Sequence, residues 1–210
     1  MDLTFCSLSS GSSGNCYYVG NGFHGILIDA GISATSIRKF LRNMMIPMDT
    51  IMGVLVTHNH SDHIKGLEVL LRKNYLPAFT TREVWESILS PHCHISTDCI
   101  REIPLMEKFH LAGFDIEAFP VCHDSPATLG FHICAGDRKI TIATDLGHIC
   151  QISAPYIKAA NLLVIESNYD EQMLKAGGYP PFLKARISSD HGHLGNHQTS
   201  LFLADILNEN

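Results

Sequence analysis

The chain has 210 residues, 45% of them hydrophobic, which is enough for one large core and predicts a single domain over residues 1–210. Its formal net charge of −6 at pH 7 argues against a broad basic surface, so any nucleic-acid binding is expected to be local. The opening residues lack the basic start of a signal peptide, and no apolar run approaches the ~20 residues of a membrane span, so we expect a cytoplasmic protein without membrane contact.

Short apolar segments typical of strands recur along the chain, separated by Gly, Asp, Asn and His. They include residues 17–19, 25–28, 51–57, 114–119, 130–134, 139–144 and 162–165. Segments with helical spacing of apolar residues lie between and after them. They are residues 33–45, 63–73, 81–89, 154–160, 171–176, 182–188 and 198–208. This order predicts two sheets covered by helices, an α/β protein built as a four-layer αββα sandwich.

Seven cysteines form an odd set without a C-x-x-C pair, which is typical of reduced thiols rather than of a disulfide framework. Most are expected to be small core residues. Cys122 directly precedes a candidate ligand, His123, but neighbours on a strand face opposite sides, so the cysteine is not expected to bind metal.

A cluster of potential metal ligands follows the apolar run 51–57. His58, His60, Asp62 and His63 fall within six residues. In extended chain, residues i and i+2 face the same way, so His58 and His60 can hold one ion while the following turn directs Asp62 and His63 to a second. The alternative, a polar strand end with chance histidines, is disfavoured by the density of ligands.

The cluster and three further motifs resemble the metallo-β-lactamase fold of hydrolases. Residues 57–63 read T-H-N-H-S-D-H, which matches the T-H-x-H-x-D-H signature, and the other motifs are residues 9–19, 143–147 and 165–168. Together they resemble the YycJ/WalJ-type branch and its nuclease relatives. The resemblance implies a metal-dependent hydrolase with the αββα sandwich already predicted.

Two later strand ends supply further ligands. His123 resembles the family's third metal histidine and is expected to join His58 and His60 on the first ion. Asp145 ends an apolar run, where a carboxylate can bridge two ions, although it could instead cap a turn. The second ion is then expected to hold Asp62, His63 and Asp145, and Asp62 is also expected to serve in catalysis.

The family usually completes the second site with one more histidine on a later strand. Here the sequence ends after the helical segment 198–208, so the final C-terminal strand region is expected to be missing and the second metal site to be weak or empty. His191, His193 and His197 are alternative donors for that position.

The turn Gly192-His193-Leu194 and the acidic motif at residues 165–168 resemble a proton-handling pair of the nuclease relatives. The resemblance implies that Glu166 orients His193, which protonates the leaving oxygen. Glu166 could instead cap a turn and His193 could begin a helix. Asp29 is expected to accept the ring N–H of a ligand histidine. The segment 9–15 could form an anion-binding turn or a tight hairpin that brings Asn15 beside the metal loops.

The leading hypothesis is hydrolysis of a nucleic-acid phosphodiester by a hydroxide that bridges the metals, with DNA favoured over RNA by the family resemblance. One alternative is a small-molecule thioesterase, lactonase or cyclic phosphodiesterase of the same fold, and another is a catalytically impaired metal-binding regulatory protein. Zinc is the first expectation for the two divalent ions, with manganese or iron as alternatives. The oligomeric state is open, and a dimer could cover an exposed sheet edge.

Overall fold

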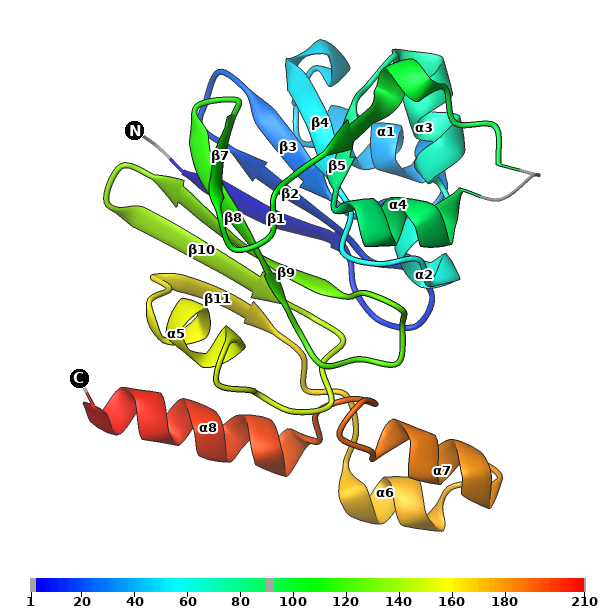
Figure 1. Ribbon diagram of the computed structural model, residues 1–210, viewed down its shortest axis with the longest axis vertical. Coiled ribbons are helices and arrows are strands. Elements are labelled where there is room, and N and C mark those ends of the chain that lie inside the picture. The colour runs from blue at the N-terminus through cyan, green and yellow to red at the C-terminus, as the bar shows by residue number, and fades with distance from the viewer. Residues whose placement is uncertain (1–2, 90–92, 210) are drawn as a thin grey trace. The chain divides into compact units, whose positions relative to one another are not determined.

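The computed structural model describes residues 3–89 and 93–209 (Figure 1). Met1 and Asp2, which begin the segment argued to lack a signal peptide, lie outside the described residues. Backbone contacts divide the chain into two compact units. Unit 1 runs to Ala118 and adds residues 125–127 and 133–138, whereas unit 2 holds residues 119–124, 128–132 and the chain from Lys139 onward.

The first sheet lies in unit 1 and is mixed, with the order β1-β2-β3-β4-β5-β6. Its strands are β1 (Thr4–Ser9), β2 (Cys16–Gly20), β3 (Gly25–Ile28), β4 (Ile51–Leu55), β5 (Ala78–Thr80) and β6 (Ile100–Glu102). β1 to β3 pair antiparallel, and β3 to β6 pair parallel. Every residue of β2 and β3 is buried, as expected for central strands covered on both faces.

The helices of unit 1 are α1 (Ala34–Asn43), α2 (Ser61–Ile64), α3 (Leu67–Asn74), α4 (Arg82–Ile88) and the 3-10 turns η1 (Met48–Thr50) and η2 (Thr97–Cys99). Three of them, α1, α3 and α4, bury apolar side chains. The Ser33 side chain caps α1 by accepting from the Ser36 N–H at 3.1 Å. Trp85 of α4 is buried and donates its indole N–H to the Arg101 carbonyl at 3.1 Å.

The second sheet has the order β11-β10-β9-β8-β7. Its strands are β7 (Lys108–Leu111), β8 (Phe114–Pro120), β9 (Leu129–Ala135), β10 (Arg138–Ala143) and β11 (Leu162–Ile165). β7 pairs antiparallel with β8, and β10 pairs parallel with β11. The sheet is therefore mixed, like the first.

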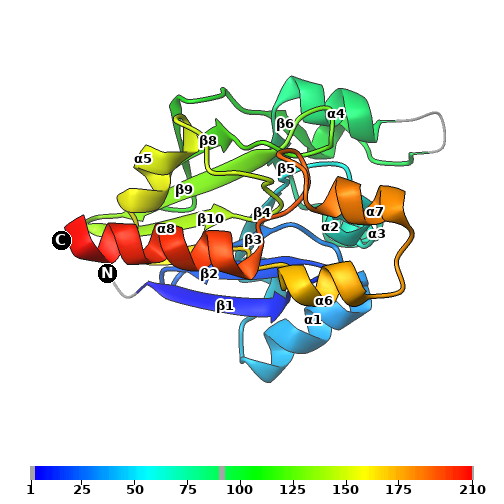
Figure 2. The ribbon, with the colours of Figure 1, turned by 90° about the horizontal axis from the view of Figure 1, so that it is seen from below.

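Unit 2 has its own apolar core. The buried members are Phe119, Val121, Ala143, Leu146, Ile157 and Leu194. Phe119 stacks on Tyr156 of α5 (Ser153–Lys158) with ring centroids 4.4 Å apart, which adds aromatic contact to the burial. Phe202 and Ile206 of α8 (Asn196–Glu209) pack against the same cluster, and α8 lies beside α5 in both views (Figures 1 and 2). The remaining helices are α6 (Glu171–Ala176) and α7 (Pro181–Ile187).

Each predicted strand and helix has a counterpart, with three kinds of difference. β1, β5, β6 and β7 were not predicted. β4 ends at Leu55, so Val56 and Thr57 already belong to the following loop. The predicted helix 63–73 is divided into α2 and α3, because the Gly66 N–H bonds to the Ala30 carbonyl at 2.7 Å rather than continuing the turn. Across residues 3–89 and 93–209, no helix is both long enough and apolar enough to span a bilayer.

Candidate metal centre

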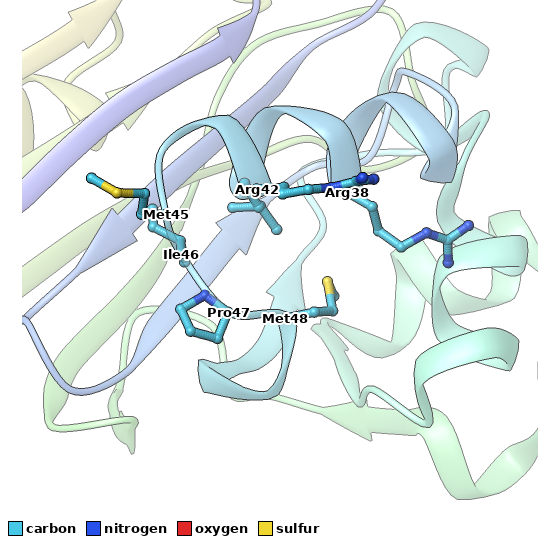
Figure 3. A pocket seen from close by; sticks show the side chains of 7 residues that line it. Arg38, Arg42, Met45, Ile46, Pro47 and Met48 are labelled. Atoms are coloured by element: carbon cyan, nitrogen blue, oxygen red, sulfur yellow. The ribbon is translucent and has the colours of Figure 1, made fainter.

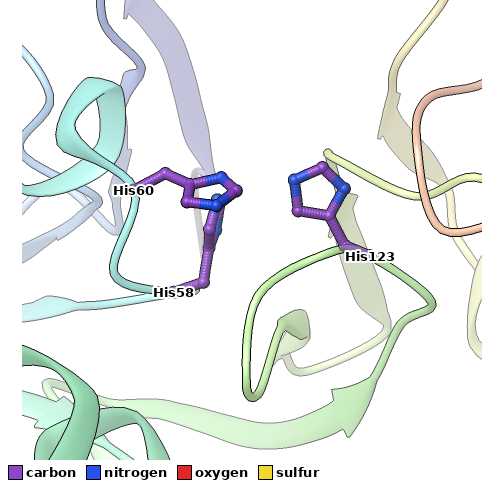
Figure 4. Close-up of side chains that lie close together, drawn as sticks. All are labelled: His58, His60 and His123. Carbon is purple, nitrogen blue, oxygen red and sulfur yellow. The ribbon is translucent and has the colours of Figure 1, made fainter. Parts of the chain in front are cut away.

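The histidine cluster of unit 1 lies in the loop from β4 into α2, where the sequence predicted it. His58 and His63 are fully buried, and His60 is half-buried. The His58 and His60 rings meet edge to face with centroids 4.6 Å apart (Figure 4), and the His58 and His63 centroids are 4.1 Å apart. Asp62 Oδ2 lies 3.7 Å from His63 Nε2. Unit 1 therefore gathers all four of its predicted ligands.

One buried carboxylate fixes the tautomers of two of these histidines. Asp29 Oδ2 accepts from His63 Nδ1 at 2.7 Å and from the Thr57 hydroxyl at 2.9 Å. Because the Thr57 hydroxyl donates its only proton to Asp29, its oxygen acts as the acceptor for His58 Nδ1, which lies 2.9 Å away. Both histidines then carry the proton on Nδ1 and the lone pair on Nε2, the arrangement found in histidines that ligate metals through Nε2. The predicted role of Asp29 thus agrees with its contacts.

Backbone hydrogen bonds hold the ligand loop against neighbouring loops. The Asn15 N–H donates to the Asp62 carbonyl at 2.7 Å, and the Ala30 N–H donates to the His63 carbonyl at 2.8 Å. The Asn15 amide nitrogen also lies 3.0 Å from His63 Nε2. Segment 9–15 therefore connects the antiparallel strands β1 and β2. It brings Asn15 beside the predicted ligands, as expected for the hairpin alternative.

Unit 2 gathers a second set of donors. His123 follows β8 (Figure 4), Asp145 follows β10, and His193 precedes α8. One ligand atom from each of these residues lies within 4.8 Å of those of the other two. His123 donates Nδ1–H to the Gly192 carbonyl at 2.9 Å, which again leaves the lone pair on Nε2. Asp145 has φ 55°, a left-handed conformation that Asp tolerates better than most residues and that sharply redirects the chain.

Glu166, which follows β11, forms the predicted pair with His193. Its Oε2 lies 2.9 Å from His193 Nδ1, and its Oε1 accepts from the backbone N–H groups of Leu146 and Leu194 at 2.7 and 3.0 Å. Burial alone would lower the pKa of His193, but the hydrogen bond and charge of Glu166, together with Asp145, raise it above the ordinary value. Glu166 therefore both orients the imidazole and favours its cationic form.

An ion pair that the sequence did not predict flanks His123. Asp124 Oδ1 lies 3.3 Å from His123 Nε2, and Asp124 Oδ2 is hydrogen-bonded to Arg186 Nε of α7. The pair raises the pKa of Arg186 above its usual range, first through the hydrogen bond and then through the charge of Asp124. The two partners are 62 residues apart, and no local pattern links them.

The cysteines and the hollow beside α1 do not belong to these two sets of donors. Within the described residues, the groups that could hold a metal consist of His and Asp side chains. A hollow of about 420 Å³ at the end of α1 is lined mainly by apolar side chains and by Arg38 and Arg42 (Figure 3). It contains none of the predicted ligands.

Comparison with known proteins decides the family. The family model described as the beta-lactamase superfamily domain matches residues 24–209. The chain belongs to this superfamily. It is 36% identical over 209 residues to Exodeoxyribonuclease YycJ of Bacillus anthracis, covering 100% of this chain and 79% of that protein. It is 34% identical over 191 residues to Exodeoxyribonuclease WalJ of Streptococcus pneumoniae (strain D39), covering 90% of this chain and 71% of that protein.

A solved structure agrees with this chain in fold. The short form of human tRNase Z matches with a TM-score of 0.67 and 17% identity, covering 97% of this chain and 88% of the other. Superfamily membership confirms the predicted α/β sandwich, and the YycJ/WalJ likeness makes the chain a metal-dependent, nuclease-like hydrolase. The fold and the His and Asp groups support binding of divalent metal.

Proposed function

We propose that this superfamily member hydrolyses phosphodiester bonds of DNA as an exonuclease. Two relatives of the chain are named exodeoxyribonucleases, and each is at least 34% identical to it. The observation that carries the proposal is the Glu166–His193 pair, whose 2.9 Å contact lies in the same unit as the donors His123 and Asp145. A positioned proton donor beside metal-binding groups is what departure of an alkoxide from phosphorus requires.

We propose six metal ligands for two divalent ions, with zinc as the first candidate and manganese or iron as alternatives. His58, His60 and His123 would hold one ion, and Asp62, His63 and Asp145 the other. The donor chemistry fits, because imidazole and carboxylate suit these metals and three of the imidazoles have Nδ1 engaged by oxygen. When bound, divalent ions supply Lewis-acid activation of water and neutralise phosphate charge.

The protein's own residues then act on orientation and on the proton. Glu166 accepts the Nδ1–H of His193 and leaves Nε2–H of the imidazolium to protonate the departing oxygen. Asp29 and Thr57 hold His58 and His63 in the tautomer that binds through Nε2. Asn15 holds α2, which carries Asp62, through its backbone hydrogen bond to the Asp62 carbonyl.

The test is degradation of end-labelled DNA and RNA by purified protein supplied with zinc, manganese or iron. We expect mononucleotides to be released from DNA, faster than from RNA, and His60→Ala to reduce the rate by at least 100-fold. Labels at the 5′ and at the 3′ end separate the two polarities. Metal-loaded protein that leaves both nucleic acids intact, with His60→Ala indistinguishable from wild type, would exclude the proposal.

A further inference from the structure

Helices α6 and α7 form an arm that buries none of its own residues. Neither helix has a buried side chain, although isolated helices this short are marginal in water. The two helices lie side by side in both views (Figures 1 and 2), and Lys184 Nζ of α7 donates to the Lys175 carbonyl of α6 at 2.6 Å. Asp170 caps α6 by accepting from the N–H groups of Gln172 and Met173. The arm is thus ordered locally, and most of its side chains are exposed.

Large apolar side chains are exposed on this arm. Met173, Tyr179 and Phe182 have 75%, 57% and 74% of their surface accessible. Their exposed area is on the order of 400 Å², well below the ~800 Å² per partner of a stable protein interface. Tyr179 and Phe182 flank a Pro-Pro step that limits backbone freedom. The area suits two stacked bases better than a second copy of the chain.

Positive charge accompanies the aromatic rings. Lys175 lies in the last turn of α6, and Lys184 and Arg186 lie in the last turn of α7. The two acidic groups, Asp170 and Glu171, are confined to the start of α6. Aromatic rings interleaved with cations, within a chain of net charge −6, match the base stacking and phosphate contacts of single-stranded nucleic acid.

The arm is joined to the proton-handling pair within unit 2. In sequence the arm lies between Glu166 and His193. The His193 N–H donates to the Ile187 carbonyl at the end of α7 at 2.9 Å. Arg186 of α7 also pairs with Asp124, the neighbour of His123. A nucleic-acid strand bound to the arm would therefore be bound to helices that are hydrogen-bonded to His193 and to Asp124, the neighbour of His123.

We propose that the α6–α7 arm binds single-stranded nucleic acid, with Tyr179 and Phe182 stacking on bases and Lys175 and Lys184 contacting phosphates. This inference rests on the proposed function, because it assigns the arm to that substrate. The arm contributes affinity for long substrates. The reacting phosphate is contacted by the proposed metal site and the Glu166–His193 pair, and not by the arm.

The test compares Tyr179→Ala/Phe182→Ala with wild type on a single-stranded oligothymidylate. We expect KM for the oligonucleotide to rise about 10- to 100-fold, from the loss of two stacked bases. Turnover of bis(p-nitrophenyl) phosphate, which is too small to reach the arm, should change less than twofold. The matched control Phe23→Ala/Tyr75→Ala removes two aromatic rings that are 78% and 89% exposed in unit 1, and it should leave KM unaltered. The exchange Tyr179→Phe/Phe182→Tyr keeps both rings and should restore wild-type KM.

Fluorescence anisotropy with a labelled phosphorothioate oligonucleotide separates the possible failures. If wild type hydrolyses no nucleic acid, the proposed function fails, and equal binding by wild type and the double variant then rejects the arm as well. If wild type degrades DNA and the double variant keeps its KM, the arm proposal alone is overturned. A dimer in sedimentation that dissociates in the double variant, with oligonucleotide affinity unaltered, also overturns it and identifies a second copy as the occupant.

Discussion

At the scale of single residues, the position of a proton decides whether a histidine can bind metal. Asp29 accepts from both His63 and Thr57, and Thr57 then accepts from His58, so one carboxylate determines two tautomers. Asp29 itself has φ 60°, which turns the chain out of β3 and toward the ligand loop. Asp29 binds no metal in our assignment, but the tautomers of two proposed ligands, His58 and His63, depend on it.

Asp29→Asn is expected to weaken metal binding about 10- to 100-fold, because the amide places a donor where His63 or Thr57 needs an acceptor. Competition with a chromogenic chelator measures the affinity directly. Asp49→Asn, an exposed change in η1 of the same unit, is the control and should have no effect. Equal affinities for the two variants would contradict the tautomer argument.

Glu166→Gln tests the proton-handling pair. The amide oxygen can still accept from the Leu146 and Leu194 N–H groups, but the charge that favours imidazolium at His193 is lost. We expect kcat on oligonucleotides to fall about 10²- to 10⁴-fold. Turnover of bis(p-nitrophenyl) phosphate should fall far less, because p-nitrophenolate leaves without a proton. A proportional loss on both substrates would assign Glu166 a structural role, and Glu171→Gln on α6 is the matched control.

At this scale the sequence indicated candidate metal donors more readily than the residues that contact them. His58, His60, Asp62 and His63 stand close together in sequence, and their spacing alone indicates a metal site. The likeness to a known signature led to His123, Asp145, Glu166 and His193. The link through Thr57 and the Arg186–Asp124 pair were missed, because their partners lie 28 and 62 residues apart and only the folded chain brings them together.

At the scale of elements, backbone hydrogen bonds join connections of unit 1 that are distant in sequence. The Gly31 N–H donates to the Asn15 carbonyl at 2.8 Å, and the Gly66 N–H donates to the Ala30 carbonyl at 2.7 Å. These bonds tie the loop after β3 to the β1–β2 connection and to the junction between α2 and α3. The close approach requires a residue without a side chain at Gly31, whose Cβ would lie 1.7 Å from the Asp62 carbonyl oxygen.

Gly31→Ala is therefore expected to destabilise the fold by about 1–3 kcal/mol, since the backbone that carries Asp62 must move. Urea denaturation followed by circular dichroism measures the change, and metal affinity should fall with it. Gly178→Ala in the α6–α7 connection meets no atom within 4 Å and is the matched control. A Gly31→Ala variant as stable as that control would show that the loop accommodates a methyl group.

Elements with clear periodicity were predicted, whereas the strands β1, β5, β6 and β7 were not. β5 and β6 have only three residues each, too few for alternation to stand out from the background. The break between α2 and α3 depends on a hydrogen bond between Gly66 and the distant Ala30, which helical periodicity cannot reveal. The prediction of two sheets rested on the remaining strands, and it did not say that each sheet is mixed.

At the scale of the whole molecule, the proposed ligands come from widely separated parts of the sequence. Residues 58–63 belong to unit 1, whereas His123 and Asp145 belong to unit 2. A chain that has lost its fold cannot hold such a set together, so metal binding is coupled to folding. The sequence led to this dispersed set because each group of proposed ligands lies in a motif that resembles the family. The spacing of the residues alone would not have shown that the groups belong to one site.

Removing metal should consequently lower the thermal stability of the whole protein. At a free metal concentration 100 times Kd, the linkage is worth about 2.7 kcal/mol, which corresponds to a Tm shift of roughly 5–10 °C for a chain of this size. Differential scanning calorimetry before and after dialysis against EDTA measures the shift, and re-addition of zinc or manganese should reverse it. His60→Ala, which removes a half-buried proposed ligand, should show a much smaller EDTA effect while keeping its circular dichroism spectrum. If wild-type protein shown to contain metal has the same Tm before and after EDTA treatment, the claim that metal binding is coupled to folding is wrong.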